Sequence, residues 1–168
     1  MRFSTKQLTL GAVLAALALA LSYVESVFML PLPLPGVKLG LANIVTLIAL
    51  YLLGAPQALA ILLVRVLLGA MFAGNASALF YSLLGGLAAL GVMALLSRSE
   101  RLSVYGVSVG GAAAHNCGQI AAAMLTLGSA APLAYLPVLL GVSLVSGALT
   151  GFITALLLGN GFLGKTIK

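Results

Sequence analysis

The chain has 168 residues, of which 62% are hydrophobic and only 6% are charged, and its mean hydropathy is +1.25. An average soluble domain is roughly 25% charged, so this chain lacks the polar side chains that would cover a water-soluble globule. The net charge of +6 collects at the ends of apolar runs, as in the cytoplasmic loops of membrane proteins, which disfavours nucleic acid as a partner. We therefore expect an integral membrane protein in contact with the lipid bilayer.

Six apolar runs have about the length that a membrane-spanning helix needs, which is roughly 17–25 residues. The first run follows Arg2 and Lys6 and resembles a secretory signal, but it continues past Leu21, so we expect a first span. Segments rich in Gly, Pro or charge separate the runs. The expected spans are Gln7–Leu30, Lys38–Leu53, Pro56–Phe72, Ser77–Ser97, Val104–Leu127 and Tyr135–Leu158.

The expected connections are short, so neighbouring helices should be antiparallel and residues 1–168 should form one compact all-α domain, a bundle of about six transmembrane helices. The basic residues predict its orientation. If both termini and the Arg98–Arg101 loop are cytoplasmic, Lys38 is the basic residue that remains on the outer side, as the enrichment of Lys and Arg in cytoplasmic loops requires. An even number of spans agrees with this orientation.

Small residues recur at a spacing of four along several runs. Gly is unfavourable in helices by about 1 kcal/mol relative to Ala in water, but small residues at this spacing let helix backbones approach closely in a bilayer. Ala12, Ala16 and Ala20 form such a stripe on the first run. The glycine pairs are Gly36 and Gly40, Gly106 and Gly110, and Gly147 and Gly151. Each set predicts either contact between helices of this chain or a docking face for a partner.

Arg65 lies in the middle of the apolar run 61–68. A charged group at the centre of a membrane helix costs at least about 2.5–3.5 kcal/mol on insertion scales, so its partner must come from another helix or from a ligand. Glu25, near the outer end of the first span, is the natural counter-ion. Two interpretations stay open: an internal ion pair of Glu25 with Arg65 or Lys38, or a site for an anionic or zwitterionic ligand.

The fifth run contains three hydrogen-bonding side chains, His115, Asn116 and Gln119, within a turn and a half. His115 and Gln119 share a helix face, and Asn116 neighbours Gln119. In a bilayer such groups should bond to other helices or line a wet cavity. No second His and no nearby carboxylate has zinc-ligand spacing, so we expect no metal and no cofactor.

The expected topology brings the polar residues together. It places Arg65 and the polar turn of the fifth run near the middle of the membrane, and the remaining polar residues toward the outer side. Together they predict a cavity that is open to the outside and suits a carboxylate or phosphate on an apolar body. The predicted substrate-binding residues are Glu25, Lys38, Asn43, Arg65, Tyr81, His115, Asn116 and Gln119.

Two forms of chemistry are not expected. The chain contains no Asp, and its two acids, Glu25 and Glu100, should lie near opposite membrane faces. Chemistry on prenyl diphosphates needs several carboxylates to hold magnesium. The segment Gly159–Thr166 matches the phosphate-loop pattern GxxxxGK[ST], but it lacks the preceding strand and the downstream acid of that loop. We therefore expect a protein that is not an enzyme.

Four blocks occur in order along the chain: Pro35–Leu47, Arg65–Gly69, Tyr81–Gly86 and Gly111–Gln119. With them the chain resembles the bacterial Gx transporter family, whose members are often labelled heptaprenyl diphosphate synthase component I. That family is similar to the substrate-binding S components of energy-coupling factor (ECF) transporters, small six-helix proteins that capture micronutrients from outside. The resemblance implies a substrate-binding subunit in the bacterial cytoplasmic membrane.

The resemblance also implies partners. In ECF transporters a separate transmembrane scaffold and two ATPases supply the power, and an AxxxA stripe on the first helix contacts the scaffold. Ala12, Ala16 and Ala20 match that pattern. The older label implies something else, a non-catalytic membrane subunit of a heptaprenyl diphosphate synthase. Both functions stay open at this point, and a self-contained carrier is disfavoured because we find no internal repeat.

Overall fold

We describe residues 4–27, 40–73 and 76–159 of a computed structural model. This part of the chain consists of six α-helices and one short 3-10 helix, η1, and contains no strand. The helices are α1 (Thr5–Val27), α2 (Asn43–Leu53), α3 (Ala55–Ala73), α4 (Ala76–Leu96), α5 (Val104–Leu127), η1 (Ala131–Tyr135) and α6 (Leu136–Gly159).

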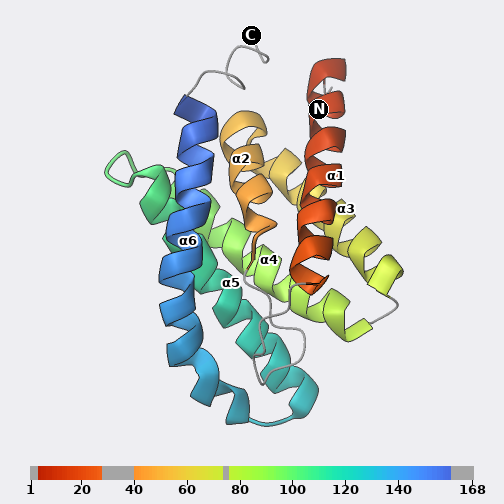
Figure 1. The fold of residues 1–168 in the computed structure, drawn as a ribbon, viewed down its shortest axis with the longest axis vertical. Helices are drawn as coiled ribbons and strands as arrows, with labels where there is room; N and C mark the ends of the chain where they lie inside the picture. Colours follow the sequence, from red (N-terminus) through yellow and green to blue (C-terminus); the bar gives the residue numbers. More distant parts are fainter. Residues whose placement is uncertain (1–3, 28–39, 74–75, 160–168) are drawn as a thin grey trace.

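The helices follow one another in alternating directions (Figure 1). Where the structure describes them, the predicted breaks form the turns between helices. Gly54, between α2 and α3, has φ +86°, and Gly128, which ends α5, has φ +59°. Such left-handed backbone favours Gly because Gly has no Cβ. At its other end α5 begins after Ser103, whose hydroxyl accepts the N–H of Gly106, a common helix cap.

The second helix differs from the prediction. We expected a span from Lys38, but α2 begins at Asn43 and has 11 residues, because Gly40 adopts φ +85° and the chain turns before the helix begins. Eleven helical residues rise about 16 Å, whereas the hydrocarbon core is about 30 Å thick. α2 is therefore too short to cross a membrane by itself.

α2 lies at the centre of the molecule instead. It contacts each of the other five α-helices, and every residue from Ala42 to Leu50 is buried. A helix that is apolar on all sides belongs in a core. α1 lies at the edge of the bundle, because among the described elements it contacts α2 and α3 alone. Figure 1 shows α1 beside α2, with α6 on the other side of α2.

Four stretches are long and apolar enough to cross a membrane by length and composition: Thr5–Val27, Ala55–Phe72, Ser77–Leu96 and Ala131–Gly159. α5 has 24 residues, but its polar turn lowers its hydropathy. The prediction of an all-helical fold is confirmed for the described residues, and the four long apolar stretches support a membrane protein. The predicted number of six spans is not confirmed. The last of the four includes η1, where the sequence predicted only a turn.

Glycines bring α5 into contact with its two neighbours. A Cβ on Gly147 of α6 would lie 2.6 Å from Cα of Val109, and one on Gly151 would lie 2.9 Å from Cα of Tyr105. On the other side of α5, a Cβ on Gly118 would lie 2.7 Å from the carbonyl oxygen of Leu84 in α4. These distances are closer than real Cβ contacts allow. Packing between helices of this chain therefore explains the pair Gly147 and Gly151.

The other two glycine pairs have different roles. Gly40 lies in the turn before α2, so it does not pack one helix on another as we expected, and its predicted pair member Gly36 lies outside the described residues. Gly110 of α5 faces Leu96 of α4, since a Cβ on Gly110 would lie 2.5 Å from a methyl group of Leu96. Gly106, four positions before Gly110, does not contact α4: a Cβ on Gly106 would meet only a methyl group of Leu102, at 3.4 Å.

Candidate functional site

Arg65 is buried in the bundle, with only 6% of its surface exposed. Its Nη1 donates a hydrogen bond of 3.0 Å to the hydroxyl oxygen of Ser22 in α1. Its Nε and Nη2 have no hydrogen-bond partner. Glu25 lies near enough for its charge to act on the guanidinium group. A guanidinium group with two unused donors is poised to bind an acceptor in a fork geometry.

Glu25 joins α1 to the turn before α2. It is buried, and its Oε1 accepts a hydrogen bond from the backbone N–H of Gly40. Ser22 and Glu25 lie three residues apart, so they point from the same face of α1. α1 therefore presents one hydroxyl group and one carboxylate to the interior of the bundle. The alternative Glu25–Lys38 pair and Lys38 itself lie outside the described residues.

A pair of glycines in α4 faces the polar side chains of α3 and α5. A Cβ on Gly86 would lie 3.4 Å from Nη2 of Arg65. A Cβ on Gly85 would lie 3.0 Å from Cε1 of His115 and 3.0 Å from Cγ of Gln119. Because Gly85 and Gly86 carry no side chains, polar groups from two different helices approach the same turn of α4.

Asn43, at the first turn of α2, completes this arrangement. A Cβ on Gly40 would lie 2.8 Å from Nδ2 of Asn43 and 3.5 Å from Cδ2 of His115. Both polar atoms of the Asn43 side chain are buried and have no hydrogen-bond partner. We call the assembly of α1, α2, α3 and α5 side chains around Gly40, Gly85 and Gly86 the central polar cluster. Its members are Ser22, Glu25, Asn43, Arg65, His115 and Gln119.

Asn116 lies apart from this cluster. Its Nδ2 donates to the carbonyl oxygen of Leu139 at 3.0 Å and to the hydroxyl group of Ser143 at 2.7 Å, both in α6. Neighbouring positions on a helix point about 100° apart, so His115 and Gln119 face α4 while Asn116 faces α6. Of the two roles expected of this turn, Asn116 therefore has the bond to another helix, and neither described cavity includes it.

Tyr81 also has a separate partner. It is buried between α4 and α5, and its hydroxyl group forms a hydrogen bond of 3.0 Å with the hydroxyl group of Thr126. The Thr126 hydroxyl group lies 3.0 Å from the carbonyl oxygens of Ala122 and Ala123. Tyr81 thus links two helices, beside a small apolar cluster with Ala122 and Ala123.

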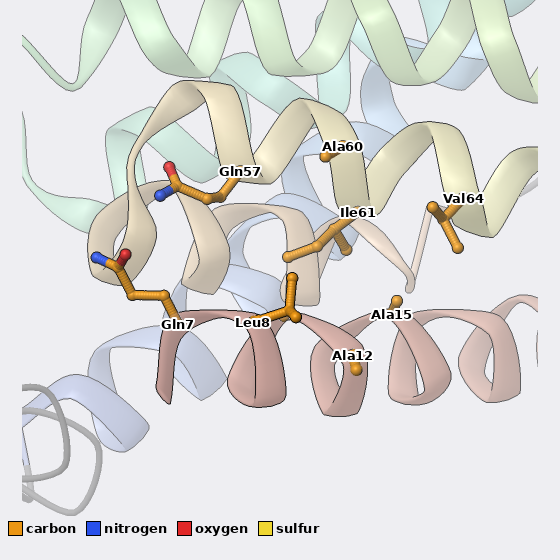
Figure 2. A pocket seen from close by; sticks show the side chains of 9 residues that line it. Gln7, Leu8, Ala12, Ala15, Gln57, Ala60, Ile61 and Val64 are labelled. Carbon is orange, nitrogen blue, oxygen red and sulfur yellow. The ribbon is translucent and has the colours of Figure 1, made fainter. Parts of the chain in front are cut away.

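Two cavities lie along the seam between α1 and α3, the line where these two helices face each other. The first has a volume of about 320 Å³, and we call it the Gln7 cavity; Figure 2 shows Gln7 and Gln57 at one end of it. The second, of about 510 Å³, lies further along α1, and we call it the Ser22 cavity. The Gln7 cavity is lined by Gln7, Leu8, Gly11, Ala12, Ala15, Gln57, Ala60, Ile61 and Val64. The Ser22 cavity is lined by Ala16, Leu19, Ala20, Ser22, Tyr23, Ser26, Gly69 and Phe72.

The alanine stripe borders both cavities. Ala12, Ala16 and Ala20 are exposed, and Ala12 lines the Gln7 cavity while the other two line the Ser22 cavity. The buried face of α1 is a different one, marked by Leu14 and Ala18. The stripe is therefore not buried against a helix of this chain in the part that the structure describes.

Some members of the cluster were missed from the sequence. Ser22 was not predicted because a serine near a helix end carries no pattern of its own. Gly85 and Gly86 belong to the block Tyr81–Gly86, but adjacent glycines in an apolar run do not by themselves predict space for polar groups from other helices. Among the described residues, no group of three or more His, Cys, Asp or Glu side chains could hold a metal ion.

Comparison with known proteins gives one match. The family model described as heptaprenyl diphosphate synthase component I matches residues 14–157, a range that includes every residue of the central polar cluster. Searches of curated proteins and of solved structures gave no match. The match covers most of the chain and agrees with the family predicted from its four sequence blocks. The chain belongs to the heptaprenyl diphosphate synthase component I family.

Proposed function

We propose that this chain is the solute-binding membrane subunit of an ECF-type transporter and that it captures a small, micronutrient-like molecule from the outer side. The single observation that carries the proposal is the buried guanidinium group of Arg65, of which two nitrogens lack a hydrogen-bond partner. A buried donor without a partner costs about 1–3 kcal/mol, and more when it is charged. A bound acceptor would recover that loss.

The surroundings of Arg65 support a ligand role over a purely structural one. Asn43 also has a buried amide group without a partner, and it lies next to Gly40, whose N–H donates to Glu25. A membrane anchor needs none of these groups, and each is costly in hydrocarbon. Buried polar groups in a membrane protein are usually functional, so we assign the solute to the central polar cluster.

Partners follow from the same proposal. Nothing in the sequence supplies a nucleotide site in its proper context, so the energy for transport would come from a transmembrane scaffold and ATPase subunits. The exposed stripe Ala12, Ala16 and Ala20 is the proposed contact with the scaffold, because small residues let another helix approach closely. The proposed location is the bacterial cytoplasmic membrane, with both termini in the cytoplasm.

Mass spectrometry of co-purified small molecules tests the proposal. The wild type, Arg65→Ala and Arg98→Ala are purified from the membrane in parallel and extracted. We expect the wild type and Arg98→Ala to retain the same solute, because Arg98 is exposed in the turn after α4, and we expect Arg65→Ala to lose it at least about tenfold, for a loss of roughly 1.4 kcal/mol or more. If all three proteins retain the solute equally, Arg65 has a structural role and does not bind the solute.

A second candidate function is a non-catalytic membrane subunit of a heptaprenyl diphosphate synthase. The description of the family favours it. The chain itself has no Asp and only two acids, so catalysis and the magnesium-binding carboxylates would have to belong to a partner. In that case the chain would anchor or regulate the partner at the membrane.

Co-purification from the native membrane separates the two candidates. The transport proposal predicts that the tagged chain brings down a membrane scaffold together with ATPases. Recovery of a soluble prenyl diphosphate synthase, with no ATPase, would favour the second candidate. As the control, Ala12→Phe should release the scaffold and ATPases while the solute stays bound, since Ala12 is exposed on α1 and does not line the Ser22 cavity.

A further inference from the structure

The Ser22 cavity has the dimensions and lining of a small-molecule site. Its volume of about 510 Å³ falls in the range of roughly 300–1,000 Å³ that is typical of ligand pockets. Leu19 and Phe72 contribute apolar surface, and Ser22, Tyr23 and Ser26 contribute hydroxyl groups. The cavity therefore suits a molecule with an apolar body and one polar end.

The Ser22 hydroxyl group connects this cavity with Arg65. It accepts the N–H of Arg65 Nη1 at 3.0 Å, and in the described hydrogen bonds it donates to no acceptor. Its own hydrogen is thus available to a molecule in the cavity. A hydroxyl group that accepts from a cation in a low-dielectric interior is a strengthened donor, because linked hydrogen bonds polarise one another. Ser22 itself is nine-tenths buried, with 9% of its surface exposed.

The charges around Ser22 favour an anion. Behind the hydroxyl group lies the Arg65 cation, which keeps Nε and Nη2 without partners. The acidic group nearby is Glu25, which does not line the cavity and whose Oε1 accepts a hydrogen bond from the N–H of Gly40. Ser26 donates its hydrogen to the backbone oxygen of Tyr23, so of the two serines in the lining, Ser22 is the one whose hydrogen has no acceptor among the described hydrogen bonds.

We propose that the Ser22 cavity binds the carboxylate end of a small organic acid with an apolar body, and that this acid reaches Arg65 sideways, through the seam between α1 and α3. This inference rests on the proposed solute-binding function and adds the chemical class of the solute and its route. α1 contacts only α2 and α3 among the described elements, so the seam can widen without disturbing the close packing of α4, α5 and α6.

The test measures whether the cavity prefers anions, using reagents that need no knowledge of the solute. In a Cys117→Ser background, Ser26→Cys places one thiol in the lining. The thiol is modified, in lipid nanodiscs, by anionic sulfonatoethyl methanethiosulfonate or by its cationic trimethylammonium-ethyl analogue. Ser129→Cys is the matched control, because Ser129 is exposed after the end of α5 and lines neither described cavity. Each rate ratio, anionic over cationic, is divided by the ratio at Ser129→Cys.

We expect the normalised anionic-to-cationic rate ratio at Ser26→Cys to be about five or more, since a cleft with a buried charge raises the local concentration of counter-ions. Adding Arg65→Gln should bring it to about one. Ser22→Ala keeps the cation and removes the hydroxyl donor, so it should lower the ratio only partly, and it serves if Arg65→Gln does not fold. A normalised ratio of one or less at Ser26→Cys without further substitutions overturns the inference. A ratio that Arg65→Gln leaves unchanged also overturns it. If Arg65→Gln does not fold, a ratio that Ser22→Ala leaves unchanged has the same meaning.

The outcome is separable from that of the proposed function. A wild type that retains a solute, together with a Ser26→Cys ratio of one, would leave the solute-binding function standing and reject the Ser22 cavity. A raised ratio without any retained solute would show an anion-selective cavity and reject the transport subunit. Identification of the retained solute as a molecule without a carboxylate would also overturn the inference.

Discussion

At the scale of single residues, the buried polar side chains divide into two groups with different roles. Asn116 is bonded to the backbone and a side chain of α6, and Tyr81 is bonded to Thr126 of α5. Oδ1 of Asn116 has no partner although its amide nitrogen is bonded twice, whereas Asn43 has no partner at either polar atom and Arg65 has none at Nε and Nη2. The first group holds helices together, and the second is where a ligand has something to bind.

A double-mutant cycle tests the role of Asn116. The side chains of Asn116 and Ser143 lie 2.7 Å apart, so Asn116→Ala and Ser143→Ala should each destabilise the protein, and their effects should be coupled by about 0.5–2 kcal/mol, the range of hydrogen bonds between membrane helices. The measurement is unfolding in mixed micelles. Cys117→Ala, on the exposed neighbour, is the control and should change little. Strictly additive effects would show that the bond contributes nothing.

The sequence revealed which residues are polar but not how they are grouped. Composition and spacing identified Arg65, Glu25 and the polar turn of α5. Grouping depends on helix rotation, and positions 115 and 116 diverge by about 100°, so one side chain faces α4 and the other faces α6. The glycines at 85 and 86 make room for groups from elsewhere in the chain. A single sequence does not reveal such a long-range relation.

At the scale of helices, the best predictions were those with long apolar runs and clear turn residues. α5 begins and ends as predicted, at Val104 and Leu127, between the serine cap and Gly128. α2 was predicted less well, because the segment around Gly40 is as apolar as a helix and only its positive φ stops the helix there. An apolar run therefore indicated burial correctly and helix length incorrectly.

Two glycines in α6 provide a matched test of close packing. A Cβ on Gly147 would lie 2.6 Å from Cα of Val109, whereas one on Gly141 would meet nothing within 4 Å. Gly147→Ala should force α5 and α6 apart and destabilise the protein by about 1–3 kcal/mol, as overpacking does. Gly141→Ala should leave the unfolding midpoint unchanged or slightly raised, because Ala favours helix. Equal effects of the two substitutions would contradict the described α5–α6 contact.

At the scale of the whole molecule, basic residues and helix directions make a joint prediction of orientation. The start of α1, the α4–α5 connection and the end of α6 lie toward one end of the bundle, and the α5–η1 connection lies toward the other (Figure 1). Arg98 and Arg101 lie in the α4–α5 connection. If this end is cytoplasmic, then the end of α1, with Ser22 and Glu25, faces outward.

Labelling of intact cells checks the orientation. In a Cys117→Ser background, a membrane-impermeant maleimide should modify Ser129→Cys from outside, and it should modify Ser99→Cys only after the cells are opened. Both serines are exposed, so access and not burial decides the result. The reverse pattern would place the solute-binding cluster toward the cytoplasm and contradict capture from outside.

The most direct measurement takes both buried charges out of the bundle and follows stability and solute retention on the same preparation. Glu25→Gln with Arg65→Leu removes the buried acidic and basic side chains of the described residues together, and replacing buried opposite charges by less polar groups is often neutral or stabilising. If the central polar cluster exists to bind solute, the double variant should melt at the same temperature as the wild type or higher, and it should retain no solute. A variant that melts lower and still retains solute would show that these charges hold the bundle together and that the ligand binds elsewhere.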